Sequence, residues 1–289
     1  MVEADPASGS SNAGRSASAP TRNLALRIVS AAVLAPLALY VAFLGGWPFA
    51  VFWAAAAAIV LWEWIALVAG SGHRLMYVSC ASAIAVAALV DWRGRPIAAI
   101  LLIGLGALAA SIFAPRDRRL WITAGIGYAG AMLLAPMLLR DDDAYGFFAL
   151  VLLFAIVWTT DILGYFAGRA FGGPKLLPAI SPKKTWSGAI AGILGAMIAA
   201  VAVASCFGSA NKIAIAAIAL VLSVVAQLGD LFESWVKRQF GAKDSGKIIP
   251  GHGGVMDRLD GFWAAALVGC LIGLVRGGLG GAARGLLVW

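Results

Sequence analysis

The sequence is poor in charged residues. Only 12% of its 289 residues are Asp, Glu, Lys or Arg, whereas about a quarter would be typical of a soluble domain. Hydrophobic residues make up 62% of the chain. This composition excludes an ordinary soluble enzyme, and it predicts an all-α, polytopic bundle of membrane-spanning helices.

Cysteine is also scarce, and we expect no cleaved signal peptide. Cys80, Cys206 and Cys270 lie far apart in apolar runs, which excludes a disulfide framework or a zinc site and predicts inert, buried thiols. The first residues are rich in Ser, Ala and Gly and lack the apolar core of a cleaved signal peptide. We therefore expect residues 1–22 to be a disordered cytoplasmic tail.

Long apolar runs fill the rest of the chain. Each is long enough to cross the hydrocarbon core of a bilayer, and Gly, Pro or charged residues separate one from the next. We divide the chain into the tail, an N-terminal membrane region over 23–140 and a C-terminal catalytic membrane region over 141–289. The nine candidate spans are 26–45, 48–70, 75–91, 96–114, 120–139, 145–168, 187–207, 212–236 and 258–277.

The distribution of Lys and Arg predicts the orientation, because positive charges favour cytoplasmic loops. With the N-terminus inside, most of the 22 Lys and Arg residues fall in loops on the cytoplasmic side. The C-terminus then lies outside. The bases left outside are Arg93, Arg95, Arg140, Lys212, Arg276 and Arg284.

The stretch 227–261 differs from the rest of the chain in its density of charge. Ionisable groups are costly beside lipid, so such a cluster indicates a functional site. The plainer alternative is that its acids simply pair with its bases. The acids are Asp230, Glu233, Asp244, Asp257 and Asp260, and the bases are Lys237, Arg238, Lys243, Lys247 and Arg258.

Helical spacing places several of these groups together. Asp230, Ser234 and Lys237 share a helix face with Gln227, with the aspartate deep in the membrane and the lysine near its surface. Asp257 begins the last span, where a helix N-terminus favours carboxylates and phosphates. Carboxylates from two helices are ligands that suit Mg²⁺, which is usually completed by water and substrate phosphates.

Other polar groups could take part. Lys183, Lys184 and Thr185 form a basic cluster that suits nucleotide phosphates or lipid head groups, although an ordinary positive-inside loop is the alternative. His252 lies among glycines that permit close approach to a ligand, and it could contact phosphate or carry a proton. Asp161 and Glu63 are further acids within apolar helices.

Two glycine-rich segments only imitate nucleotide-binding motifs. Residues 241–248 nearly fit a Walker A loop, but Ile248 replaces the required hydroxyl and no strand precedes them. Residues 277–285 do not follow a strand either. What remains is a membrane site with acids for a metal and bases for phosphates. Phosphoryl or nucleotidyl transfer fits such a site, because it needs mainly positioning and charge neutralisation.

Residues 234–260 resemble the signature of the phosphatidate cytidylyltransferases. The matching pattern reads SxVKRxxxxKDxGxxIPxHGGVxDRLD. The segments Gly229-Asp230-Leu231-x-Glu233-Ser234 and Ser181-Pro182-Lys183-Lys184-Thr185-Trp186 are similar to that family too, as is Asp161 with Tyr165, Gly168 and Arg169. One departure is Ser187, where the family usually has Glu.

The resemblance implies that CTP and phosphatidic acid react to give CDP-diacylglycerol and pyrophosphate. It implies Mg²⁺ as cofactor, with room for a second, monovalent cation. Asp230 and Asp257 would be the first metal ligands, and Asp161 and Asp260 would be the next candidates. The catalytic residues would be Asp230, Lys237, Arg238, His252, Asp257 and Asp260. The substrate-binding residues would be Ser181, Lys183, Lys184, Thr185, Ser234, Lys243, Asp244, Gly253, Gly254 and Arg258.

The same resemblance implies a bacterial-type inner membrane with the active site facing the cytoplasm. We expect no nucleic-acid partner, and the sequence is compatible with a homo-oligomer. A lipid cannot leave the bilayer without a large cost in free energy, and CTP cannot enter it. We therefore expect a polar cavity that opens both to the cytoplasm and sideways to the lipid. Its walls would carry Asp161, Asp230, Asp257 and residues 181–185.

Three alternatives stay open. A kinase or cytidylyltransferase acting on another membrane lipid, such as a polyprenol, would use similar groups. A proton-coupled transporter also carries buried carboxylates, although no inverted repeat relates the two halves. A CDP-alcohol phosphotransferase is disfavoured, because Asp260-Gly261 is followed by Phe262-Trp263 and its acidic motif is absent.

Overall fold

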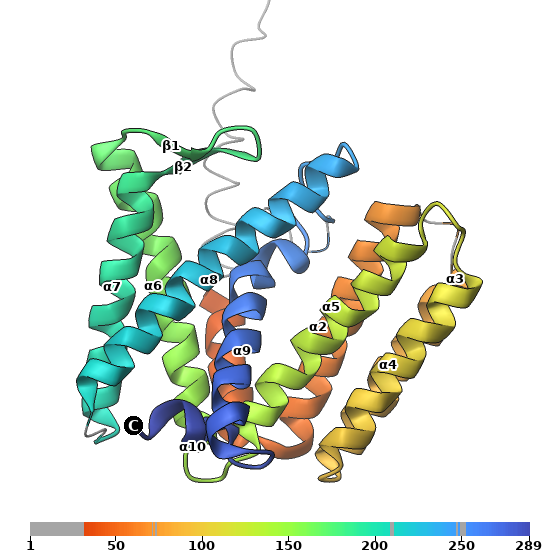
Figure 1. Cartoon of the computed structure of the whole chain (residues 1–289), viewed down its shortest axis with the longest axis horizontal. Coiled ribbons are helices and arrows are strands. Elements are labelled where there is room, and N and C mark those ends of the chain that lie inside the picture. The colour runs from red at the N-terminus through yellow and green to blue at the C-terminus, as the bar shows by residue number, and fades with distance from the viewer. Residues whose placement is uncertain (1–31, 71, 73, 209–210, 247, 249–252) are drawn as a thin grey trace, which may run out of the picture.

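A computed structural model describes residues 32–70, 72, 74–208, 211–246, 248 and 253–289. The predicted tail over 1–22 and the predicted site residue His252 lie outside the described residues. Within them the fold is a bundle of apolar helices (Figure 1).

Among the described residues, eight helices are long and apolar enough to cross a membrane. They correspond to the second to ninth predicted spans, and a shorter apolar helix, Ala32–Leu44, lies in the first. The chain is thus a multi-pass integral membrane protein. The eight are α2 (Gly46–Ala69), α3 (Arg74–Trp92), α4 (Pro96–Phe113), α5 (Arg119–Arg140), α6 (Gly146–Phe171), α7 (Trp186–Cys206), α8 (Lys212–Gln239) and α9 (Met256–Gly277).

The structure adds two short elements that the sequence did not predict. β1 (Lys175–Leu177) and β2 (Ser181–Thr185) form an antiparallel hairpin between α6 and α7. Strands this short leave no readable alternation of side chains, and Pro182 weakens the strand signal further. A final helix, α10 (Ala282–Leu287), packs against α9.

One expectation about the cysteines is wrong. Cys80 and Cys270 are buried as predicted, but Cys206 is exposed. Cys206 is the last residue of α7, and the end of a helix has fewer neighbours to cover it than the middle.

A layer of stacked aromatic rings joins helices from both halves of the chain. Phe262 of α9 stacks on Trp53 of α2 with ring centroids 5.1 Å apart and on Phe154 of α6 at 4.9 Å. Trp263 of α9 stacks on Tyr128 of α5 at 4.2 Å. Such contacts add directional packing to the apolar core, and they place α9 at the centre of the bundle.

The polar segments gather at one end of the bundle. Figure 1 shows β1, β2, the end of α8 and the start of α9 at that end, with α10 and the C-terminus at the other. This agrees with the prediction that residues 181–185 and Trp289 lie on opposite sides of the membrane. Which of the two sides faces the cytoplasm stays a prediction.

Candidate functional site

The hairpin delivers Lys184 to the acidic face of α8. Thr185 ends β2 and caps α7, because its hydroxyl accepts a hydrogen bond from the Gly188 amide at 3.2 Å. This cap fixes where the strand stops. The preceding residue, Lys184, then places Nζ 2.5 Å from Oδ2 of Asp230.

Ser187, where the family usually has Glu, is held by local contacts. Its hydroxyl donates to the carbonyl of Gly172 and lies 3.1 Å from the hydroxyl of Thr185. Ser187 therefore helps to fasten the end of α6 to the start of α7.

Helix α8 presents its acids on two adjoining faces. Asp230 Oδ1 accepts a hydrogen bond from the Ser234 hydroxyl at 3.3 Å, so these two residues share a face as predicted. Glu233 and Lys237 occupy the neighbouring face, with Lys237 Nζ 3.2 Å from Glu233 Oε1. That contact is an ion pair, and among the described residues neither oxygen of Glu233 has a hydrogen-bond partner.

The surroundings of Lys237 were not foreseen from the sequence. Its place near the membrane surface stays a prediction, and the structure shows that the side chain is buried between Glu233 and Asp257. The cause is the tertiary packing of α9, which brings Asp257 Oδ1 within 2.6 Å of Lys237 Nζ. A buried charge needs such partners to offset the loss of hydration.

Asp257 begins α9 and is held by three donors. Its Oδ1 accepts a hydrogen bond from the Lys237 ammonium group. Its Oδ2 accepts hydrogen bonds from the amides of Ser245 at 3.0 Å and Gly254 at 2.8 Å. The adjacent Gly253 has a φ of 85°, a conformation that favours glycine. The backbone before α9 thus closely approaches the Asp257 carboxylate, whereas its predicted approach to a ligand stays a prediction.

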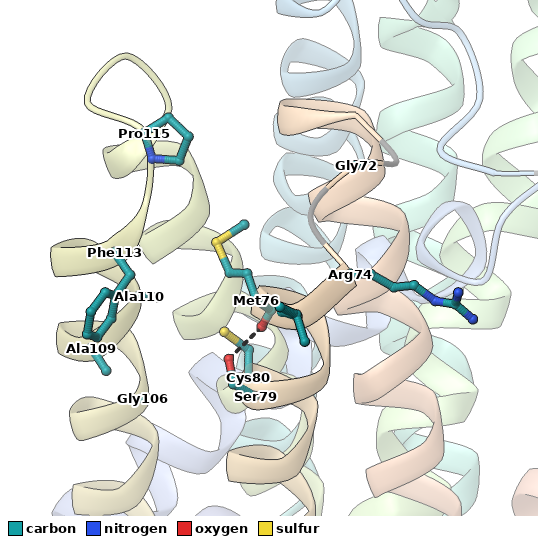
Figure 2. A pocket seen from close by; sticks show the side chains of 11 residues that line it. Gly72, Arg74, Met76, Ser79, Cys80, Gly106, Ala109, Ala110, Phe113 and Pro115 are labelled. Atoms are coloured by element: carbon teal, nitrogen blue, oxygen red, sulfur yellow. Dashed lines mark hydrogen bonds between the residues drawn. The ribbon is translucent and has the colours of Figure 1, made fainter.

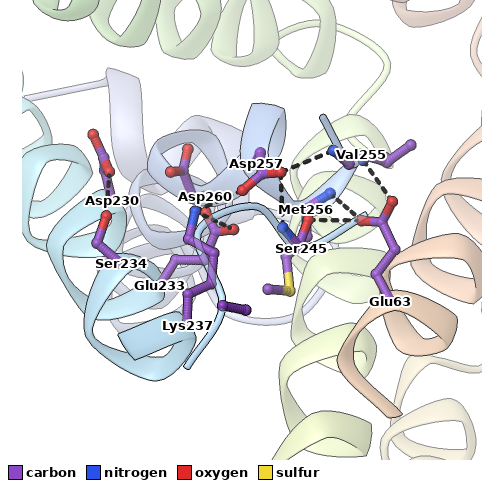
Figure 3. Close-up of polar contacts among 12 residues, drawn as sticks. Glu63, Asp230, Glu233, Ser234, Lys237, Ser245, Val255, Met256, Asp257 and Asp260 are labelled. Carbon is purple, nitrogen blue, oxygen red and sulfur yellow. Dashed lines mark hydrogen bonds and ion pairs between the residues drawn. The ribbon is translucent and has the colours of Figure 1, made fainter. Parts of the chain in front are cut away.

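Asp260 and Asp161 complete the acidic cluster. Asp260 Oδ1 accepts a hydrogen bond from the Gly261 amide at 2.7 Å and lies within electrostatic reach of Asp230, Glu233 and Asp161. Figure 3 shows Asp260 between Asp230 and Asp257 in its view. Asp161 of α6 interacts electrostatically with Asp230, Lys184 and Arg258. Carboxylates from three helices therefore gather near the same end of the bundle.

The remaining candidates lie around this cluster. The Arg238 guanidinium donates to the carbonyl of Ala242 at 2.7 Å, which ties it to the end of α8. Ser181 and Ser234 are half-buried, and Thr185 and Gly254 are buried. The exposed ones among these remaining candidates are Lys183, Arg238, Lys243, Asp244 and Arg258.

The acids do not form a ready-made metal site in the described segments. Within them, no group of three or more His, Cys, Asp or Glu side chains has the geometry to hold a metal ion. Asp230 and Asp257 instead contact Lys184 and Lys237. The plainer alternative, pairing of acids with bases, thus describes these two contacts.

Glu63 was predicted from the sequence as a buried acid in an apolar span, and its burial is confirmed. Its contacts were not predicted. In the structure it is 1% exposed and reaches from α2 to the start of α9. Its partner Ser245 gave no signal in the sequence.

Two cavities lie along the hairpin of α3 and α4, away from the acidic cluster. One of about 630 Å³ has Met76, Ser79 and Cys80 on one side and Ala109 and Phe113 on the other (Figure 2). The second, of about 710 Å³, lies nearer Arg93 and Arg95. Neither is the polar cavity expected among the acids, which stays a prediction.

Comparison with known proteins defines the class of this protein. The sequence profile of the cytidylyltransferase family matches residues 25–274, so the chain belongs to that family. It is 43% identical over 265 residues to the phosphatidate cytidylyltransferases of Brucella abortus and Brucella suis, covering 88% of this chain and 94% of theirs. It is 48% identical over 118 residues to the phosphatidate cytidylyltransferase of Rickettsia bellii, covering 38% of this chain and 51% of that one. The resemblance inferred from the sequence is thus confirmed.

Proposed function

We propose that this protein is a CTP:phosphatidate cytidylyltransferase that makes CDP-diacylglycerol for phospholipid synthesis. The observation that carries the proposal is the 43% identity to enzymes of that name across 88% of the chain. The gathering of acids and bases at one end of a membrane bundle supports it, because this end offers both carboxylates and cations to phosphate groups.

In this reaction a phosphate oxygen of phosphatidic acid attacks the α-phosphorus of CTP. A new P–O–P bond forms, the bond between the α- and β-phosphates breaks, and pyrophosphate leaves with the bonding electrons. Such transfers depend on positioning and on neutralising phosphate charge. Lys184 and Lys183 on β2, with Arg258, Lys243 and the end of α8 at Arg238, would hold the phosphates of the two substrates.

The chemistry of the acids suits Mg²⁺, because Asp161, Asp230, Asp257 and Asp260 would supply the oxygen ligands that this ion prefers, although in the described structure they do not converge on one metal position. When bound, Mg²⁺ would neutralise phosphate charge. A second, monovalent cation would use the same carboxylates. Lys184 and Lys237 now contact two of these acids, which supports a demand for positive charge at this position.

The substrates would meet at the cytoplasmic boundary of the membrane. A reporter fused after Trp289 should score as external, and one placed between β1 and β2, near Pro178, should score as cytoplasmic. The physical reason is the excess of Lys and Arg on the predicted inner side. A cytoplasmic signal after Trp289 would contradict the orientation or the number of spans.

The activity itself is tested by pyrophosphate release from the purified protein in mixed micelles. We expect release that requires CTP, Mg²⁺ and phosphatidic acid together, with CDP-diacylglycerol formed in equal amount. Polyprenyl phosphate in place of phosphatidic acid is the informative control. Release with that lipid and none with phosphatidic acid would favour the alternative enzyme instead.

A further inference from the structure

The carboxylate of Glu63 anchors the start of α9 from a different helix. Glu63 lies within α2 and is 1% exposed. Its Oε1 accepts a hydrogen bond from the Val255 amide at 2.9 Å, and its Oε2 accepts bonds from the Met256 amide at 2.8 Å and the Ser245 hydroxyl at 3.2 Å (Figure 3). A buried carboxylate with three donors is strongly oriented.

Two glycines make room for this carboxylate. A Cβ atom on Gly246 would lie 2.6 Å from Glu63 Oε1, and a Cβ atom on Gly254 would lie 2.5 Å from Oε2. Real Cβ atoms essentially never come that close to another heavy atom. The backbone just after Ser245 and just before α9 is therefore fitted to Glu63.

Glu63 and Asp257 divide the same set of donors between them. Ser245 gives its hydroxyl to Glu63 and its amide to Asp257. At the start of α9 the Gly254 amide bonds Asp257, while the Val255 and Met256 amides bond Glu63. The first amides of a helix have no partner within the helix itself, so these two acids together fix where α9 begins.

We propose that Glu63 is a positioning residue for the transfer reaction. It holds Ser245 and the first turn of α9, and through them it sets the place of the Asp257 carboxylate beside Lys237. In this role Glu63 acts on the substrates only through Asp257 and not by direct contact. The catalytic part of this inference rests on the proposed function, whereas the anchoring part does not.

Hydrogen exchange tests whether Glu63 anchors the start of α9, and it needs no activity assay. In Glu63→Gln, one acceptor oxygen becomes an amide group that cannot accept from an N–H donor. We expect the amides of Val255 and Met256 to exchange roughly ten- to hundredfold faster, because bonds to a charged acceptor are lost. The matched control is Trp64→Phe, which removes the bond from Trp64 Nε1 to the Trp121 carbonyl at 2.8 Å. It should leave these amides unchanged, and unchanged exchange in Glu63→Gln would overturn the anchor.

Steady-state kinetics then tests the positioning role. We expect Glu63→Gln to lower kcat roughly a hundredfold, as a small displacement of a reacting group can do, with the KM for CTP nearly unchanged. Glu63→Asp keeps the charge and should recover part of kcat. Faster amide exchange with an unaltered kcat would overturn the positioning role and leave a merely structural one. If Glu63→Gln does not insert, Ser245→Ala should still lower kcat about fivefold through loss of one hydrogen bond, and a normal kcat in that variant would equally refute the proposal.

The two tests separate this inference from the proposed function. If the wild-type protein releases no pyrophosphate while Glu63→Gln shows the faster exchange, the proposed function fails and the anchor stands. If the wild-type protein is active and the exchange of Val255 and Met256 is normal in Glu63→Gln, the inference about Glu63 fails alone.

Discussion

The helix pairs α3–α4 and α8–α9 are both apolar enough to cross a membrane, yet they differ in where they hold charge. Helix α3 carries Arg74 and Asp91 near its two ends, and α4 has no ionisable residue. Helices α8 and α9 carry all their acids and most of their bases toward the ends that meet. Average hydropathy therefore identifies a span. The position of its few charges indicates whether the span contributes residues to a functional site.

The surroundings of the two pairs differ as well. The α4 side chains Leu101, Leu105 and Ile112 are exposed on the bundle, as expected of a helix that faces lipid. Glu233 and Lys237 of α8 are buried and paired. Removing one member of a buried pair leaves an uncompensated charge, so changes in α8–α9 should cost far more than changes in α3–α4.

The largest effect is expected for Asp257→Asn. The variant keeps the side chain's volume but removes the charge that Lys237 and two backbone amides contact. We expect kcat to fall by roughly 10²–10³-fold, the scale of losing one electrostatic group in a polar active site. Pyrophosphate release in micelles measures this. Asp117→Asn, at an exposed surface pair, is the control, and near-normal activity of Asp257→Asn would remove the acid from the proposed site.

A smaller effect is expected for Lys184→Ala on the hairpin. This change removes the ammonium group that pairs with Asp230 at 2.5 Å and that we assign to substrate phosphates. The KM for CTP or phosphatidic acid should rise about tenfold, because a charge-assisted contact contributes on that scale. Lys175→Ala removes an exposed lysine from β1 of the same hairpin and should leave both KM values unchanged. Equal effects of the two changes would mean that Lys184 serves only as a general positive charge.

A glycine-to-alanine change should destabilise the protein more in the pair α8–α9 than in the pair α3–α4. A Cβ atom on Gly229 of α8 would lie 2.6 Å from the Asp260 carbonyl and 2.7 Å from Ala264 Cβ. Gly229→Ala should therefore cost about 1–3 kcal/mol, as overpacking does, and lower the Tm in detergent. Gly104→Ala in α4, where nothing lies within 4 Å, should leave the Tm equal or slightly higher. The reverse order would contradict the close packing of α8 on α9.

The smallest effect is expected for Arg74→Gln. Arg74 starts α3 and borders the cavity of about 630 Å³ that lies away from the acidic cluster. Turnover should stay within about twofold of the wild type, as for substitutions outside functional contacts. The same pyrophosphate assay measures it. A loss comparable to that of Lys184→Ala would extend the site to α3 and weaken the contrast between the pairs.

The sequence by itself determined the spans and the set of candidate residues. A run of apolar side chains is a local property, and the hydrocarbon core demands it along each helix separately. Spacing along one helix likewise predicted that Asp230 and Ser234 share a face, and the hydrogen bond between them confirms it. The residue types and their spacing within 234–260 were enough to indicate the family.

Only the tertiary structure decided which charges meet. Lys184 pairs with Asp230 across two elements, Lys237 is enclosed by Glu233 and Asp257, and Glu63 reaches a loop that lies far along the chain. Helical periodicity gives the direction in which a side chain points, but it does not identify the helix that lies opposite. That choice depends on how large and small side chains of all the helices pack at once, a property of the whole bundle that no single segment contains.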